Sequence, residues 1–255
     1  MSTTSAEGST GRLRFLVVVA AVVVAVALGA VYALGGFATS STLASPEVVA
    51  HTGLVNNDTP VQTTPISVAQ GSLLVLFLSW PNAIVGGGYP VSITDSLFDI
   101  YHLEVSTSYA TNHTEAVYAA SPALANSSLV VTVTFAAGAT PMGGSVSVVD
   151  VSHANLSSID GTYWDDGFGP TAGISVVANH TGDLVLFGAA GRGVSGPFTA
   201  GPGATLLDTG TGTSGPFQDG TGFGTLSAVA SGTTIQITAS LNVPTGWVAT
   251  AVAIR

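Results

Sequence analysis

Residues 127–135 read SSLVVTVTF, and residues 233–241 read TTIQITASL. Apolar and polar side chains alternate in both stretches. The apolar positions are Leu129, Val131, Val133 and Phe135 in the first stretch, and Ile235 and Ile237 in the second. Successive side chains of a β-strand point to opposite faces, so this alternation predicts strands with one buried face and one solvated face.

Short runs suited to strands continue beyond residue 60, separated by Gly, Asn and Pro, and no stretch there has helical periodicity. The runs are 72–79, 100–107, 114–120, 128–136, 145–152, 174–178, 183–189, 225–231, 233–240 and 247–254. Because crossover helices are missing from this pattern, it predicts an all-β fold rather than an α/β fold. We expect an antiparallel β-sandwich of the jelly-roll or Ig-like kind.

The two halves of this region resemble each other in order. ISVAQGSLLVLF (66–77) is echoed by ISVVANHTGDLVLF (174–187), ITDS (93–96) by LLDT (206–209), AVYAA (116–120) by SAVAS (227–231), and VSVVDVS (146–152) by the terminal VATAVAI. This order predicts pseudo-repeats over about 48–152 and 153–255. Since no long polar linker separates them, we expect one unit over 48–255, with two tandem Ig-like domains as the alternative.

The succession TDSLFDIYHLEV (94–105), TEAVYAA (114–120), VTVTF (131–135) and VDVS (149–152) resembles uncharacterised prokaryotic secreted or surface-anchored β-sandwich proteins. The resemblance covers residues 66–152 and, more weakly, the second half. It implies a β-sandwich at the cell surface and supplies no catalytic residue.

An uncharged apolar segment lies near the start of the chain. Residues 15–34 read FLVVVAAVVVAVALGAVYAL, which as a helix spans about 30 Å of hydrocarbon. Arg12 and Arg14 precede it, and the next cation is Arg192. The positive-inside rule therefore predicts a single-pass anchor with residues 1–14 in the cytoplasm, a Ser/Thr-rich stalk at 35–47, and residues 48–255 outside.

Two alternatives to this anchor stay open. One is a signal peptide cleaved after Ala38 or Ala44, which would release a secreted protein. The other is a type IV pilin-like subunit, in which Arg12 and Arg14 would be costly inside the helical bundle of the filament.

Charge is scarce, with 4 Lys plus Arg against 14 Asp plus Glu and no Cys in 255 residues. Such a chain lacks the basic stripe of a nucleic-acid binder, and it has no disulfide or thiolate nucleophile. Asn-X-Ser/Thr sequons predict glycosylation, which would supply hydration that charged side chains do not. They start at Asn57, Asn112, Asn126, Asn155 and Asn179.

Two clusters carry candidate binding residues. In the first, a hairpin over 101–118 would place His102 with Glu104, and His113 with Glu115, on strand faces suited to Zn²⁺ or another divalent ion. The second is DGTYWDDGF (160–168), which we expect to be a Gly-bounded loop. Its carboxylates are Ca²⁺ candidates and its aromatic side chains are candidates for stacking on a sugar, or for anchoring the loop. The carboxylates are Asp160, Asp165 and Asp166, and the aromatics are Tyr163, Trp164 and Phe168.

No nucleophile elbow, phosphate loop or paired-carboxylate motif occurs in its required context, so we expect no enzyme and, apart from Ca²⁺, no cofactor. The predicted function is a surface protein for binding or for envelope structure, with surface glycans or further copies of the chain as partners. A lectin-like adhesin, and a secreted hydrolase whose site forms only by tertiary contact, are the alternatives.

Overall fold

The computed structural model describes residues 45–52, 55–57, 60–81, 90–109, 113–122, 124–135, 144–192, 199–212, 219–232 and 234–255. The anchor segment 15–34 and the sequon at Asn112 lie outside these residues. None of the helices in the described ranges has the length and apolar character needed to cross a membrane. Ser45–Arg255 forms one unit by its internal contacts.

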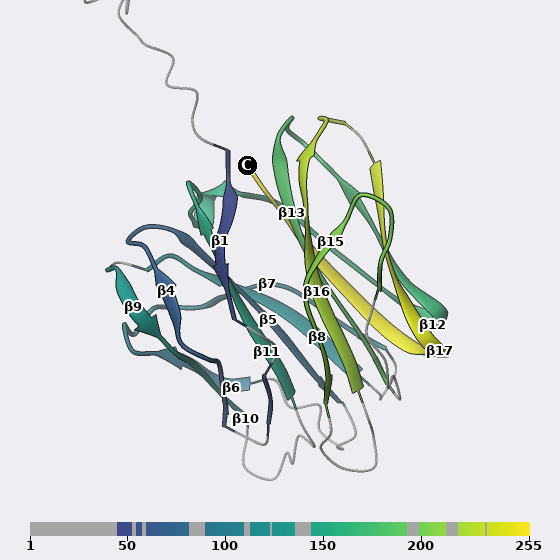
Figure 1. The fold of residues 1–255 in the computed structure, drawn as a ribbon, viewed down its shortest axis with the longest axis horizontal. Coiled ribbons are helices and arrows are strands. Elements are labelled where there is room, and N and C mark those ends of the chain that lie inside the picture. The colour runs from purple at the N-terminus through teal and green to yellow at the C-terminus, as the bar shows by residue number, and fades with distance from the viewer. Residues whose placement is uncertain are drawn as a thin grey trace, which may run out of the picture. The chain divides into compact units, whose positions relative to one another are not determined.

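Six strands form what we call the first sheet (Figure 1). In spatial order they are β1 (Glu47–His51), β11 (Gly144–Ser152), β5 (Leu73–Pro81), β8 (His113–Ala120) and β7 (His102–Tyr109), and β2 (Val55–Asn57) also pairs with β11. All of these pairings are antiparallel. The predicted hairpin over 101–118 is the β7–β8 pair.

Two smaller antiparallel sheets cover one face of the first sheet. One contains β3 (Val61–Gln62), β10 (Val131–Phe135) and β6 (Pro90–Asp95), and the other contains β4 (Ile66–Val68) and β9 (Asn126–Leu129). Leu129, Val131 and Val133 are fully buried there, packed against Leu74, Leu76 and Leu78 of β5. The buried alternation predicted for this stretch is therefore confirmed at these three positions.

The second sheet has the order β12 (Ile159–Val177), β17 (Thr234–Ile254), β13 (Asp183–Arg192), β16 (Asp219–Val229) and β15 (Thr205–Gly212), with β14 (Thr199–Ala200) paired to β17. A short 3₁₀ helix, η1 (Leu156–Ser158), precedes it. The pairing of β12 with β17 shifts register between Gly169 and Thr171. Beyond this bulge, Ile174 and Ile237 pack back onto Phe187 of the same sheet.

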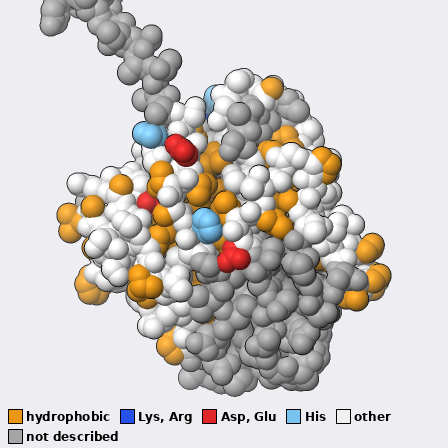
Figure 2. All heavy atoms as spheres, in the orientation of Figure 1, with side chains coloured by type: hydrophobic (Ala, Val, Ile, Leu, Met, Phe, Trp, Pro, Cys, Tyr) orange, Lys and Arg blue, Asp and Glu red, His pale blue; other side chains and the backbone are white. Residues whose placement is uncertain are grey.

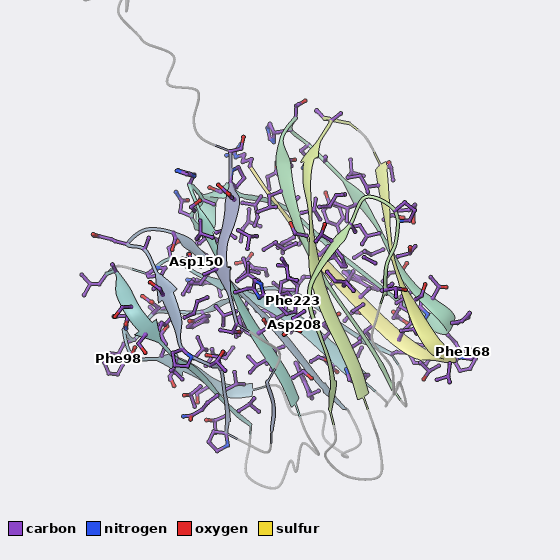
Figure 3. All side chains as sticks on the ribbon, in the orientation of Figure 1. Phe98, Asp150, Phe168, Asp208 and Phe223 are labelled. Carbon is purple, nitrogen blue, oxygen red and sulfur yellow. The ribbon has the colours of Figure 1, made fainter. Side chains whose placement is uncertain are left out.

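The first and second sheets pack face to face. The apolar residues between them include Leu73, Val75 and Phe77 from β5 and Leu184, Leu186 and Phe223 from β13 and β16. The rings of Phe77 and Phe223 are stacked with centroids 5.9 Å apart, and Figure 3 shows Phe223 between the two sheets. The described part of the chain is thus all-β and antiparallel, as predicted for this region, with a sandwich-like stack of sheets.

Three local predictions were wrong. Residues 160–168, expected as a loop, belong to β12, because their backbone pairs with β17 from Gly161–Ala253 to Phe168–Gly246. The strands expected over 233–240 and 247–254 are not separate, because residues 234–254 form the single strand β17. The single strand expected over 128–136 is instead divided, over its described residues, between β9 and β10.

Most of the sequence segments that resemble each other between the two halves form strands at the same position in the two sheets. β5 and β13 are third in their sheets, β8 and β16 are fourth, and β11 and β17 are second. The pair ITDS and LLDT does not follow this rule, because 93–95 pairs with β10 outside the first sheet while 206–209 pairs with β16 inside the second.

Candidate functional site

Two carboxylates and a histidine meet where β12 and β13 begin. One side-chain ligand atom from each of Asp160, His180 and Asp183 lies within 4.8 Å of the others. His180 Nδ1 is 2.5 Å from Asp160 Oδ2, and the backbone N–H of His180 donates to Asp183 Oδ2 at 2.9 Å. We call these three residues the Asp-His-Asp cluster.

The strand pairing explains how residues so far apart in sequence come together. Ile254 of β17 pairs with Ile159 of β12 on one side and with Leu184 of β13 on the other. Asp160 occupies a β-bulge, since the register shifts between Ile159 and Gly161, and such bulges re-aim side chains. The turn between β12 and β13 then carries His180 across the end of the sheet.

Burial distinguishes the members of the Asp-His-Asp cluster. Asp183 is 1% exposed, whereas the side chain of His180 is 51% exposed and that of Asp160 is 10% exposed. The Oδ1 atoms of Asp160 and Asp183 are buried and accept no hydrogen bond. Buried carboxylate oxygens are ordinarily paired, so two such atoms in one cluster of three residues call for an explanation.

Tyr163 lies in the same electrostatic environment. Its hydroxyl donates to the carbonyl of Val177 at 2.5 Å. Burial raises the pKa of the Tyr163 phenol, the Val177 hydrogen bond lowers it, and the negative charges of Asp160 and Asp183 raise it further. The cluster therefore presents negative potential at this end of β12.

The other predicted acidic residues lie away from this point. Asp165 pairs with Ala249 and Asp166 with Val248, and Asp165 Oδ1 accepts from the backbone N–H of Asp166. Asp165 follows Asp160 by five strand positions, about 16 Å along the backbone. Among the described residues, Asp160 is the one Ca²⁺ candidate that lies in a group of three potential metal ligands.

Two of the three predicted aromatic residues are exposed on β12. Trp164 is 60% exposed and Phe168 is 71% exposed, and Figure 3 shows Phe168 at the outer side of the second sheet. They share one face of the strand because their spacing is even and no register shift intervenes. Tyr163, on the opposite face, is partly buried. The exposed pair does not anchor a loop.

A further aromatic side chain lies beside this pair. A Cβ built on Gly246, which pairs with Phe168, would collide with ring atoms of Tyr109 in β7. The ring of Tyr109 thus rests on the backbone next to Phe168, and only a glycine allows this approach. The exposed side chains of Trp164 and Phe168 in the second sheet thus have the partly buried Tyr109 of the first sheet next to Phe168.

The four His and Glu candidates of the β7–β8 hairpin are divided between its two ends. His102 pairs with Ala119, whereas His113 pairs with Tyr109. His102 is exposed and Glu104 is half-buried, and burial raises the pKa of Glu104 while nearby His102 lowers it. The hairpin register therefore does not bring the two pairs to one point.

His113 and Glu115 belong instead to a buried polar group between the sheets. Both are 1% exposed, and Ser79 Oγ is hydrogen-bonded to His113 Nε2. A Cβ on Gly188 of β13 would collide with Glu115 Oε1, so the carboxyl group lies directly under that strand. Burial raises the pKa of Glu115 well above its ordinary value, and the adjacent Thr250 lowers it by less.

The described sequons have different surroundings. Asn57 lies in β2, and Nδ2 of Asn126 at the start of β9 donates to Ser96 Oγ. Asn179 is exposed in the β12–β13 turn, and its Nδ2 donates to the carbonyl of Asp160. Asn155 is exposed at the start of η1, where its Oδ1 accepts from the backbone N–H and hydroxyl of Ser157.

His180 and Asp183 were missed at the level of sequence, although a signal for them exists. The segment 174–187 is two residues longer than its echo 66–77, and the extra residues fall in the turn that carries His180. Gly71 and Gly182, at matching places, both have positive φ, of 74° and 93°. Comparison with protein families, with curated proteins and with solved structures finds no match to this chain.

Proposed function

We propose that this protein is a membrane-anchored cell-surface protein whose exported β-sandwich binds carbohydrate through the exposed aromatic face of β12. Residues 15–34 would anchor it with the N-terminus in the cytoplasm, for the reasons of length and flanking charge given above. The similar strand positions in the two sheets favour an internal duplication of one Ig-like or jelly-roll half.

The observation that carries the proposal is the exposure of Trp164 and Phe168, at 60% and 71%, on the edge strand of the second sheet. Large aromatic side chains are seldom left so exposed in pairs on one strand unless something covers them. Their separation along the strand is about 13 Å. Rings at that spacing suit an extended chain of sugar rings better than a single small molecule.

A polar group near the rings supports the same ligand class. Asp166, between Trp164 and Phe168 on the same strand face, is partly exposed. Carboxylates accept hydrogen bonds from sugar hydroxyls, while the aromatic rings cover apolar sugar faces. The chain's low charge fits an uncharged, hydroxyl-rich ligand better than an ionic one.

Binding is tested with the full-length chain in detergent on an array of neutral and acidic oligosaccharides. We expect Trp164→Ala to abolish glycan binding. Phe98→Ala is the matched control, because Phe98 is 86% exposed but lies after β6, away from β12, as Figure 3 shows. The carbohydrate proposal fails when the wild-type chain binds no glycan, or when Trp164→Ala and Phe98→Ala bind equally well.

The same face suggests a second candidate, self-association in an envelope layer. β12 is an edge strand, and an exposed apolar edge is a template for pairing with another copy. Sedimentation of the same preparations separates the two candidates. An ordered polymer that disappears in Trp164→Ala, without glycan binding, would favour the structural role.

The membrane placement has its own test. In intact cells, added protease should degrade the part of the chain after residue 48 while residues 1–14 stay protected. The mass of the mature protein distinguishes the anchor from a cleaved signal peptide. Loss of the segment 15–34 from the mature chain would refute the anchor and leave the protein secreted.

A further inference from the structure

We infer that Asp160, His180 and Asp183 form a binding site for a divalent transition-metal ion of the Zn²⁺ class. This inference is independent of the carbohydrate proposal, because the Asp-His-Asp cluster does not include Trp164 or Phe168. The three side chains offer two carboxylate oxygens and one imidazole nitrogen within 4.8 Å of one another.

The buried oxygens point to a cation. Asp183 is 1% exposed, and its Oδ1 lies in the interior without a hydrogen bond, as does Oδ1 of Asp160. The backbone N–H of His180 satisfies only Oδ2 of Asp183. The two carboxyl groups have oxygens within 4.8 Å of each other, and a positive ion bound among them would offset their negative charge and give the cluster a partner that the protein does not supply.

The donor set selects the class of ion. Imidazole nitrogen with carboxylate oxygen is typical of Zn²⁺ and its first-row neighbours, whereas Ca²⁺ and Mg²⁺ take oxygen ligands only and in larger number. Three protein ligands leave one tetrahedral position for water. Because the side chain of His180 is 51% exposed, an ion could reach the cluster from solvent.

A small movement adapts the geometry. His180 Nδ1 and Asp160 Oδ2 are 2.5 Å apart, while two ligands of one tetrahedral Zn²⁺ are about 3.3 Å apart. Because the His180 side chain lies in a turn and is 51% exposed, a rotation of its ring opens this gap without disturbing the core. The two aspartates are held in place by the pairing of β12 and β13 with β17.

A bound ion would connect three segments that lie close together in the fold. These are the bulge of β12, the β12–β13 turn and the first residue of β13. It would also place a cation beside Tyr163, whose pKa the two carboxylates raise. We therefore expect the ion to stabilise the edge of the second sheet.

The experiment is a calorimetric titration of the untagged full-length chain with ZnCl₂, with CaCl₂ in a parallel arm, followed by thermal unfolding. We expect one equivalent of Zn²⁺, no saturable Ca²⁺ binding, and a higher melting temperature with Zn²⁺. His180→Ala removes a direct ligand and should weaken Zn²⁺ binding by about 100-fold or more. Removing a residue that only orients a ligand costs about 10- to 100-fold, so loss of the ligand itself should cost at least as much.

Two further variants make the result specific. His153→Ala is the matched control, since His153 is an exposed histidine outside the cluster, and its Zn²⁺ affinity should equal that of the wild type. Asp160→Asn should weaken binding as His180→Ala does, and a cobalt absorption spectrum would show loss of the tetrahedral site in both. The inference is overturned if the wild-type chain binds no Zn²⁺, if it binds Ca²⁺ more tightly, or if His180→Ala and His153→Ala titrate alike.

Discussion

Replacing Glu115 by Gln should stabilise the protein at neutral pH. Glu115 lies between the two sheets at 1% exposure, and neither carboxyl oxygen accepts a hydrogen bond of ordinary geometry. Burial raises its pKa well above the ordinary 4.5, and Thr250 offsets only part of this. The folded state therefore binds a proton that the unfolded state releases, and ionisation of Glu115 opposes folding.

The sign of the pH dependence follows from that direction. Below about pH 4.5, Glu115 is protonated in the folded and the unfolded state, and its ionisation takes nothing from the free energy of unfolding. As the pH rises from there through the raised pKa of the folded state, the free energy of unfolding falls, because the unfolded state releases the proton more readily. Gln keeps the shape and cannot ionise, so the variant should lack the decline.

The magnitude can be set from the burial. A buried polar group without a partner costs about 1–3 kcal/mol, and a charged one costs at least as much. We expect Glu115→Gln to raise the free energy of unfolding by about 1–3 kcal/mol at pH 7.5. For a domain of 150–250 residues this is a rise of roughly 2–12 °C in melting temperature.

Urea unfolding at a series of pH values measures the effect. Glu47→Gln is the control, because Glu47 is exposed at the start of β1, and it should unfold like the wild type. The variant and the wild type should converge at the acid end of the series. A Glu115→Gln protein that is less stable than the wild type at pH 7.5, or a difference that is the same at every pH, would refute the reasoning.

Three other substitutions follow from the same packing. Gly188→Ala should destabilise by about 1–3 kcal/mol in urea unfolding, because the new Cβ collides with Glu115, and an unchanged midpoint would contradict the close approach of the two sheets at this point. Phe223→Ala should cost about 3–5 kcal/mol by emptying the space between the sheets; a loss below about 1 kcal/mol would mean that the sheets do not pack there. In a glycosylating host, Asn155→Gln should remove one glycan by intact-protein mass, since Asn155 is exposed; an unchanged mass would mean that this sequon is not used.

The strands of the core could be predicted because apolar and polar side chains alternate along them, and the apolar ones are buried. Leu129, Val131 and Val133 are apolar at every second position, and all three are fully buried. The face of Figure 2 likewise shows what the composition predicts, with apolar and uncharged polar atoms dominating and few acidic side chains among the described residues. Local pattern fails for β12 between Asp160 and Phe168, where glycines and aspartates suggest a turn. Pairing with β17 supplies the hydrogen bonds that hold this segment extended.

The candidate sites could likewise be predicted only in part. Asp160 was identified because Asp165 and Asp166 are close to it in sequence, but the extended strand places them at a distance from it. Its actual companions are 20 and 23 residues further along the chain, in a turn and at the start of another strand. Exposure of Trp164 and Phe168 could not be read from the sequence either, because an aromatic residue in a strand pattern fits a buried face as well as an open one.

The sequence by itself determined an antiparallel β protein with little charge, an apolar segment at 15–34 and two halves of similar order. These properties depend on composition and on the spacing of apolar residues along the chain, and both can be read from residues that are close in sequence. Only the tertiary structure decided that Asp160, His180 and Asp183 converge, that Glu115 is sealed between two sheets, and that β12 leaves its aromatic face open. Each of these depends on which strands lie side by side, and that choice is made by long-range pairing and packing rather than by any local run of residues.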